Sequence, residues 1–449
     1  MAANTKEQVL DTPFAPVEAQ SQTQVDKAYS YWRFRLMLTL IIGYSAFYVV
    51  RQNFSMAVPS MLHELGYTKN QIGWVFTTFS IVYGISKFIS GTISDRSNAR
   101  YFMTIGLLGA AAVNLVMGFS ESIFLIGVMY AANGFFQSMG WPPCTRLLTH
   151  WYGPSQLGTR WGIVNASHQI GSVVILLGAF WLITNYSWRH VFIVPGFGCL
   201  ALALFVFMRL RDVPTSLGLP SIEEKEGLVT EAQAAEASAE ERLTYRQIFF
   251  EKILPNKPLW CVCIANFFVY IVRMGVFNWG PTFLQEYKGI DLFQAGKQLS
   301  LFEIAGLVGG FLAGWLSDHW FRGRRGRVSF LYMVVLAFAV AGFWFVPASM
   351  PFVGVFCLFM MGFLVYGPQV LVGVAAAEFG SKKAACAAAG LTGTFGYLGG
   401  AASGIGVAYV ATNWGWGATL CSFVVAAVLG ALCFLCIWNK TEQAIPEKK

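Results

Sequence analysis

The chain alternates long apolar runs with short polar segments between residues 33 and 438. Each apolar run holds about 20 residues, the length that an α-helix needs to cross a bilayer core of about 30 Å. The pattern predicts an all-α polytopic membrane protein with twelve transmembrane helices. The expected spans are 33–60, 70–94, 102–120, 123–148, 159–185, 190–210, 258–286, 294–317, 328–346, 351–379, 383–411 and 415–438.

One long polar segment divides these spans into two groups of six. It contains the run Glu223–Glu226 and the alanine- and glutamate-rich run Glu231–Glu241, so it predicts a partly helical cytoplasmic linker. The chain is therefore expected to have five parts. They are a cytoplasmic tail (1–32), an N-terminal six-helix half (33–210), the linker (211–257), a C-terminal six-helix half (258–438) and a second cytoplasmic tail (439–449).

The composition agrees with a membrane protein. Hydrophobic residues make up 56% of the 449 residues and charged residues only 12%, whereas soluble proteins carry about 25% charged residues. The formal net charge of +8 lies in the loops, where it is a topology signal rather than a sign of nucleic-acid binding. The nine cysteines lie in or beside apolar spans, and their spacing indicates neither a disulfide framework nor a zinc site.

Lysine and arginine are distributed unevenly between the two sets of loops. If the N-terminus is inside, the short inner loops hold ten of them and the outer loops hold four. The outer four are Lys69, Arg189, Lys288 and Lys297. Met1–Ser30 has no apolar stretch, so we expect a tail rather than a cleaved signal peptide. The positive-inside rule thus predicts that both termini are cytoplasmic.

Two short motifs recur in both halves at nearly the same offset. Phe47–Arg51 (FYVVR) in the first span matches Val269–Arg273 (VYIVR) in the seventh, 222 positions later. Gly91–Asp95 (GTISD) matches Gly314–Asp318 (GWLSD), 223 positions later. Parallel repeats of this kind predict two halves that are related by a pseudo-two-fold axis and face each other across a central path.

Arg51 and Arg273 occupy equivalent positions deep inside apolar spans. An arginine at the centre of a membrane helix costs about 2.5–3.5 kcal/mol on insertion scales, so such a residue marks a functional site. Guanidinium groups keep their charge and present a fork of donors that matches phosphate oxygens. A phosphomonoester carries a charge of about −1.5 to −2 at neutral pH, which two arginines balance. The alternative is that each arginine snorkels to an interface or pairs within its own half.

Further polar and aromatic residues lie in the spans around these arginines. Tyr44, Tyr48 and Arg51 are spaced at i, i+4 and i+7, which places them on one helix face. The other candidates for lining the path are Tyr83, Lys87, Asn165, His168, Tyr270, Tyr366 and Tyr397. Each tyrosine is otherwise a packed aromatic residue, and His168 is otherwise a hydrogen-bonded core histidine. Glu303 is the only acid deep in the eighth span.

The glycine–aspartate motif lies where spans two and eight enter their loops. Its charged residues are Asp95 and Arg96 in the first half, and Asp318, followed by several arginines, in the second. An acid in such a loop pairs with a base or caps a neighbouring helix, and so holds one conformer. We expect these residues to act in gating; the simpler interpretation is a positively charged topology loop.

Several runs of sequence together resemble one known family of transporters. The runs are GYSAFYVVRQNF (43–54), YGISKFISGTISDRSNARYF (83–102), GWPPC (140–144), VNASHQIG (164–171), FFVYIVRMGVFNWGPTFL (267–284), FEIAGLVGGFLAGWLSD (302–318), GFLVYGPQVLVG (362–373) and GTFGYLGG (393–400). Over nearly its whole length the chain is similar to the organophosphate:phosphate antiporters of the major facilitator superfamily. The run SDRSNARYFM (94–103) is most similar to their branch of hexose-phosphate transporters and sugar-phosphate sensors, which is related to the glycerol-3-phosphate transporter.

The resemblance implies both a fold and a role. It implies the major facilitator fold, with rocker-switch alternating access between the two halves. It also implies that Arg51 and Arg273 bind phosphate, with Lys87, His168 and nearby tyrosines beside them. The expected substrates are a sugar phosphate, with glucose 6-phosphate first, and inorganic phosphate. The expected setting is the bacterial inner membrane, where the chain contacts membrane lipid and acts as a monomer.

The chain departs from the resembled family at several positions. Relatives carry lysine where this chain has Gln52 and aspartate where it has Asn278, so both charges are absent together. An amide pair can keep a hydrogen bond without charge, and we expect Gln52 and Asn278 to act as an uncharged gate between the halves. In span eleven the hexose-phosphate permease has an aspartate and a lysine where this chain has Ala389 and Thr392, which leaves the sugar open.

The two permanent cations predict obligate exchange. An empty site with two arginines is costly to close inside a bilayer, whereas a bound phosphate offsets their charge, so only loaded carriers cross readily. We expect Glu303 to neutralise the empty site in part or to couple closure to binding.

Two other functions stay open at this stage. One is a proton-coupled organophosphate symporter, glycerol 3-phosphate included, in which His168 and Glu303 titrate. The other is a membrane sugar-phosphate sensor that signals to a kinase. An enzyme is not expected, because the sequence contains no nucleophile–base pair or metal cluster, and no cofactor is expected.

Overall fold

The computed structural model describes residues 22–94, 97–227, 250, 253–347, 349–379 and 381–440. Every regular element in these ranges is a helix, so the predicted all-α fold is confirmed. The elements are α2 (Gln22–Glu64), α3 (Lys69–Ser94), α4 (Ala99–Phe119), α5 (Ile123–Gln137), α6 (Trp141–Trp151), α7 (Pro154–Asn185), α8 (His190–Arg209), the 3₁₀ helix η2 (Pro214–Leu217), α9 (Ile222–Glu226), α12 (Lys257–Lys288), α13 (Leu292–His319), α14 (Arg325–Phe345), α15 (Pro351–Phe379) and α16 (Ser381–Leu435).

The described chain has eleven helical stretches that are long and apolar enough to cross a membrane. One of them, in α16, is long enough to cross it twice. Helix α16 is interrupted at Gly415, whose φ of 81° and ψ of 175° favour glycine. Its two parts correspond to the eleventh and twelfth predicted spans. The fourth span is built from α5 and α6, which together run from Ile123 to Trp151. The count of twelve spans therefore agrees with the prediction.

Helix ends extend beyond the predicted spans where the sequence is polar. Helix α2 begins at Gln22 rather than at 33 and ends at Glu64 rather than at 60, and α7 begins at Pro154 rather than at 159. The hydropathy criterion finds only the part of a helix that lies in lipid. The criterion therefore does not detect the polar helical turns that lie outside the bilayer.

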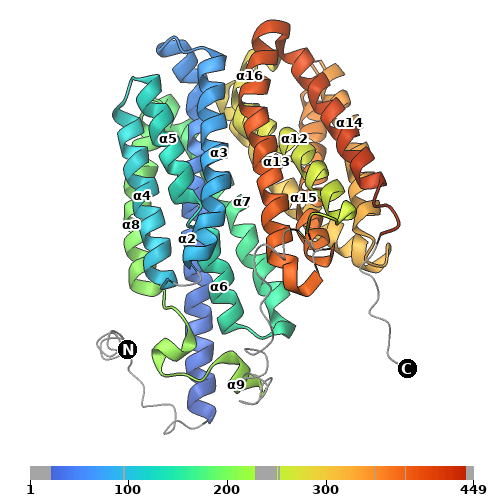
Figure 1. Ribbon diagram of the computed structural model, residues 1–449. Helices are drawn as coiled ribbons and strands as arrows, with labels where there is room; N and C mark the ends of the chain where they lie inside the picture. The colour runs from blue at the N-terminus through green and yellow to red at the C-terminus, as the bar shows by residue number, and fades with distance from the viewer. Residues whose placement is uncertain are drawn as a thin grey trace.

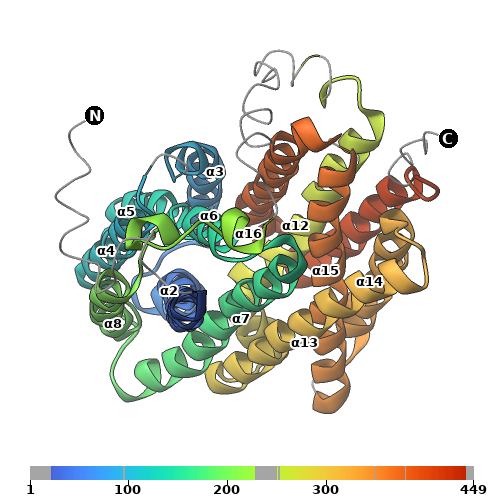
Figure 2. The same cartoon turned by 90° about the horizontal axis from the view of Figure 1, so that it is seen from below.

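The helices form two bundles that lie side by side (Figures 1 and 2). Helices α2 to α8 make the N-terminal bundle and α12 to α16 make the C-terminal bundle. Three helix pairs pack across the boundary, and they are α3 with α16, α7 with α13, and α2 with α12. The core of the site described below lies where α2 meets α12.

At the end away from α9 the two bundles are in close contact. Gly73 of α3 faces Gly404 of α16 so closely that a Cβ atom on Gly73 would lie 2.9 Å from the Gly404 carbonyl oxygen. The Thr77 hydroxyl donates to the Ala401 carbonyl at 2.8 Å. Lys69 and Glu286 form an ion pair of 2.8 Å between α3 and α12. These contacts hold the halves together at this end.

The first part of the linker packs on the N-terminal bundle. The Tyr29 hydroxyl of α2 donates to the Pro220 carbonyl at 2.6 Å, and Lys225 of α9 pairs with Asp26 of α2. Helix α9 accounts for the helical character expected around Glu223–Glu226. The predicted helical run Glu231–Glu241 lies outside the described residues.

The glycine contact predicts that Gly73→Val separates α3 from α16. A valine there overlaps the backbone of α16, and overpacking of this kind costs about 1–3 kcal/mol, which is about a 5- to 150-fold shift between conformers. Spin labels at the exposed positions Trp74 and Tyr409 allow the distance to be measured by double electron–electron resonance. Gly406→Val is the control, since no atom lies within 4 Å of a Cβ atom there. Equal distance distributions in the two variants would contradict the prediction.

Candidate functional site

A kink in α2 positions Arg51. Val50 has non-helical dihedral angles (φ −93°, ψ 16°), so carbonyl groups near it lose helical partners. Side-chain amides replace these partners, since Asn114 and Asn133 each donate to the Val50 carbonyl at 2.9 Å. Gln137 donates to the Phe47 carbonyl at 2.7 Å. Backbone groups inside a membrane must be satisfied by the protein, so these amides stabilise the kink that carries Arg51.

Arg51 is surrounded by aromatic rings and is only 2% exposed. Its Cζ atom lies 4.9 Å from the ring centroid of Tyr83, 5.0 Å from that of Phe79 and 5.3 Å from that of Tyr48. Cation–π contacts of this length are favourable, and more so away from water. They stabilise a buried charge without using up its hydrogen-bond donors.

Arg273 lies on α12 in the opposite half and is 4% exposed. Its Cζ atom lies 4.9 Å from the ring centroid of Tyr366 and 5.6 Å from that of Tyr270. Its Nη2 atom donates to the Tyr366 hydroxyl at 3.4 Å, and that hydroxyl donates to Oε2 of Glu303 at 2.7 Å. Arg273 is therefore linked through a tyrosine to the buried acid of the eighth span.

The ring of Phe277 is shared by the two arginines. Its centroid lies 5.7 Å from Cζ of Arg51 and 6.0 Å from Cζ of Arg273. Within the described chain, the Nε atoms of both arginines have no hydrogen-bond partner, and no carboxylate oxygen lies within 4.0 Å of either side chain. The two guanidinium groups thus approach each other from opposite halves, and each keeps a hydrogen-bond donor that no described group accepts.

His168 of α7 lies between tyrosines of both halves. Its ring centroid is 5.1 Å from that of Tyr48 and 6.2 Å from that of Tyr366. Nδ1 contacts the Asn165 carbonyl, and Nε2 is buried with no hydrogen-bond partner among the described residues. Of the predicted pair in span five, Asn165 thus contributes its backbone oxygen to this contact, and His168 keeps one ring nitrogen unpaired.

Tyr397 of α16 joins the remaining predicted residues. Its ring centroid lies 4.4 Å from that of Tyr83 and 5.5 Å from that of Tyr270, and Nζ of Lys87 is 5.7 Å from it. Tyr44 packs on Tyr48 at 5.6 Å. The structure thus gathers the eleven predicted binding residues into one cluster at the boundary of the halves.

The expected amide pair between Gln52 and Asn278 is not formed. Nε2 of Gln52 donates to the Phe277 carbonyl at 2.9 Å and to the Ser55 hydroxyl at 3.1 Å, and its Oε1 has no partner in the described chain. Backbone of α12 is therefore nearer to the amide than the Asn278 side chain is. A hydrogen bond does cross between the halves here, but its acceptor is a main-chain carbonyl.

The loop residues expected to act in gating are only partly described. Asp318 pairs with Arg325, whose Nη2 atom also lies 3.0 Å from Oε1 of Glu378 at the end of α15. This network lies within the C-terminal half, and whether it gates transport stays a prediction. Asp95 and Arg96 lie outside the described residues.

Five important neighbours of the arginines were not predicted. They are Phe79, Phe277, Asn114, Asn133 and Gln137. The amides carried a usable signal, because polar side chains inside apolar spans must find partners. The two phenylalanines carried none, since nothing in a sequence distinguishes a phenylalanine beside a cation from one in an apolar core.

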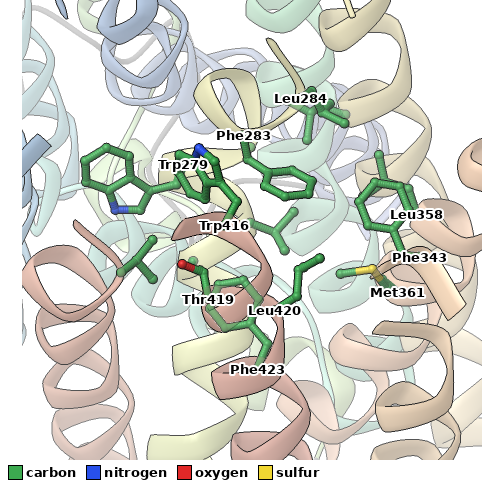
Figure 3. Close-up of a pocket in the computed structure, with 15 residues that line it drawn as sticks. Trp279, Phe283, Leu284, Phe343, Leu358, Met361, Trp416, Thr419, Leu420 and Phe423 are labelled. Carbon is green, nitrogen blue, oxygen red and sulfur yellow. The ribbon is translucent and has the colours of Figure 1, made fainter. Parts of the chain in front are cut away.

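A separate cavity inside the C-terminal half does not fit a phosphorylated ligand. Figure 3 shows that aromatic and aliphatic side chains such as Trp279, Phe283 and Trp416 line it. Its volume of about 20 Å³ is close to that of a single water site. It is a packing gap, so the arginine cluster remains the candidate site.

The sequence profile of the Major Facilitator Superfamily matches residues 40–404. The chain belongs to this superfamily. A solved member of similar fold is a bacterial homologue of the human lysosomal transporter Spinster, in an inward-facing and unoccupied conformation. It superposes with a TM-score of 0.70 at 15% sequence identity, covering 91% of this chain and 95% of that one. The relatives reported next are named as transport proteins or as a membrane sensor, in agreement with the prediction that the chain is not an enzyme.

Three relatives place the chain within the superfamily. It is 42% identical to the probable hexose phosphate transport protein of Chlamydia pneumoniae, with 95% of each chain covered. It is 37% identical to the membrane sensor protein UhpC of Escherichia coli, covering 95% of this chain and 97% of that one. It is 37% identical to the glycerol-3-phosphate transporter of Bacillus subtilis, covering 96% and 98%. The predicted branch of the superfamily is confirmed.

The link between Arg273 and Glu303 predicts an effect of Tyr366→Phe. The substitution leaves the buried Glu303 carboxylate without its donor, which costs about 1–3 kcal/mol of stability. We expect a lower melting temperature of the purified protein in detergent. Tyr332→Phe is the matched control, because the Tyr332 hydroxyl is buried with no partner in the described chain. Equal shifts in the two variants would show that the Tyr366 hydroxyl stabilises nothing.

Proposed function

We propose that this protein is a secondary active transporter that imports a sugar phosphate in exchange for inorganic phosphate. The phosphate group binds between Arg51 and Arg273, and glucose 6-phosphate is the first candidate for the sugar phosphate. The observation that carries this proposal is the convergence of two buried guanidinium groups, one from each half, on the ring of Phe277.

Charge balance supports a doubly charged ligand. Arg51 and Arg273 remain charged at any physiological pH. Glu303 is linked to Arg273 only through the Tyr366 hydroxyl. A phosphomonoester or hydrogen phosphate brings a charge of about −1.5 to −2. Its oxygens accept from the unpartnered Nε atoms and so satisfy donors that are left open in the protein alone.

The same balance explains exchange. Without ligand, two cations face each other in a closed, water-poor site, and their repulsion is screened only by aromatic faces and by Glu303. Bound phosphate removes this repulsion and joins α2 to α12 through one anion. Only the loaded protein therefore moves readily between its two orientations, which makes each phosphate carried inward depend on one carried outward. In this proposal the chain acts as a monomer with both termini in the cytoplasm.

The names of the relatives support the class of substrate. The chlamydial relative is named for hexose phosphate and the Bacillus relative for glycerol 3-phosphate. Phosphate is common to both ligands, and the arginines are the natural partners of phosphate. We further propose that Lys87, His168 and Tyr397, which lie beside the arginines, contact the organic part of the substrate.

Two observations favour second candidates. UhpC of Escherichia coli is named a sensor and is 37% identical to this chain, which favours a sugar-phosphate sensor. The unpartnered Nε2 of His168 and the buried Glu303 favour a proton-coupled symporter.

Uptake into liposomes separates these functions. We expect labelled glucose 6-phosphate to enter liposomes loaded with phosphate at least about tenfold faster than liposomes loaded with sulfate, because only a phosphate-loaded site returns outward. Arg51→Gln should reduce this uptake to the level of protein-free liposomes. Arg189→Gln should leave it unchanged, because Arg189 pairs with Glu121 at the outer surface.

The other outcomes each identify a rival. Uptake that needs no internal phosphate and is abolished by a protonophore would replace exchange by proton coupling. Saturable binding of glucose 6-phosphate without uptake would make the protein a sensor.

A further inference from the structure

A cavity of about 500 Å³ lies at the linker end of the N-terminal half, away from the arginine cluster. It is an open hollow bordered by the start of α2, the start of α7 and the short linker helix α9, whose position at the lower end of α2 is visible in Figure 1. Three cations line it, and they are Arg33, Arg160 and Lys225. Nothing in the transport mechanism uses these residues.

Arg33 is fixed in place with one nitrogen unused. Its Nε atom donates to the Trp151 carbonyl at 2.8 Å, and its Cζ atom lies 5.1 Å from the ring of Tyr29 and 4.8 Å from that of Tyr152. Its Nη2 atom is buried without a hydrogen-bond partner in the described chain, and the nearest carboxylate, of Glu226, is 3.9 Å away. A guanidinium held in this way contributes a fixed positive charge beside the cavity.

The other two cations come from different elements. Arg160 of α7 lies over the ring of Tyr152 at 5.5 Å, and no carboxylate oxygen of the described residues lies within 4.0 Å of it. Lys225 of α9 lies 5.2 Å from the ring of Tyr29 and pairs with Asp26, an exposed acid. Arg160 has no acid partner among the described residues. Three cations and the single acid Asp26 line the cavity, so its lining carries a net positive charge.

An apolar strip leads from this cavity along α2 into the membrane. Phe34 lines the cavity and is 73% exposed, and Leu38, four residues further on the same helix face, is 38% exposed. Ile163 of α7, three residues after Arg160, is 41% exposed. A cationic cavity that continues into an exposed apolar strip matches an amphiphile, whereas a free phosphate needs only the cavity.

We propose that this cavity binds the phosphate headgroup of an anionic phospholipid of the cytoplasmic leaflet, with an acyl chain along Phe34 and Leu38. The phosphate accepts from Arg160 and is attracted by the charge of Arg33, and Lys225 contacts its far side. The positive-inside bias places the linker end in the leaflet whose anionic lipids attract basic segments.

The bound lipid would connect three elements that are otherwise joined by few polar contacts. Arg33 belongs to α2, Arg160 to α7 and Lys225 to α9. One headgroup between them holds the beginning of the linker on the N-terminal half at the membrane surface. This site is independent of the proposed transport function, because it shares no residue with the arginine cluster.

Native mass spectrometry of the purified full-length protein tests the proposal. The probes are phosphatidylglycerol and phosphatidylcholine of the same chain length. We expect one phosphatidylglycerol to be retained at least about fivefold more strongly than phosphatidylcholine. Arg160→Gln/Lys225→Gln should bring the retention of the two lipids to about the same level, since each surface cation favours the binding of anionic lipid. Arg322→Gln, which removes an exposed cation at the same end of the C-terminal half, should change nothing.

Further arms keep the result decisive. If the double variant does not fold, Arg160→Gln alone serves as the variant, since it removes only one cation–π contact. It should also lower the retention of phosphatidylglycerol relative to phosphatidylcholine. Equal retention of the two lipids by the unmodified protein would overturn the site. An equal loss of the preference for phosphatidylglycerol in Arg322→Gln would overturn it as well. Displacement of phosphatidylglycerol by excess inorganic phosphate would show that the cavity binds a free anion, and would overturn the proposal that its ligand is a lipid.

Discussion

The structure depends on the burial of two uncompensated arginines at the boundary of its halves. Each guanidinium is almost fully removed from solvent, and no carboxylate of the described chain pairs with it directly. Such a charge in a membrane interior is tolerated when polarizable rings and hydrogen bonds surround it. The aromatic shell, the polar amides that hold the α2 kink and the Tyr366–Glu303 link all serve this requirement. In the proposed function, a ligand with two negative charges would complete it.

Sequence was sufficient for the architecture and for naming residues that the structure brings together at the boundary of the halves. Membrane spans depend on composition over about 20 residues, a signal that tertiary contacts do not override. The internal repeat is sufficient to relate Arg51 to Arg273, because duplication leaves equivalent residues at equivalent depths in the membrane. The tyrosines and His168 were found because each polar group in lipid needs a partner.

Sequence was insufficient wherever a role depends on which atoms meet across the boundary. The bond from Gln52 goes to the Phe277 carbonyl instead of the Asn278 side chain, since a one-residue change in the facing backbone decides the acceptor. The kink at Val50 follows from amides on α4 and α5 that have no distinctive spacing. The cationic cavity beside α9 combines residues separated by up to 199 positions, and only the packing of the linker brings them together.

Phosphate binding by single and double arginine variants tests the central claim most directly. Isothermal titration calorimetry of the purified protein should give one inorganic phosphate per chain. Arg51→Gln and Arg273→Gln should each weaken it at least about tenfold, as expected for a lost charge-assisted hydrogen bond. The double variant should weaken phosphate binding by a smaller factor than the product of the two single-variant factors, because both arginines hold one anion. Fully independent losses, or unchanged binding in the double variant, would contradict a shared site between the halves.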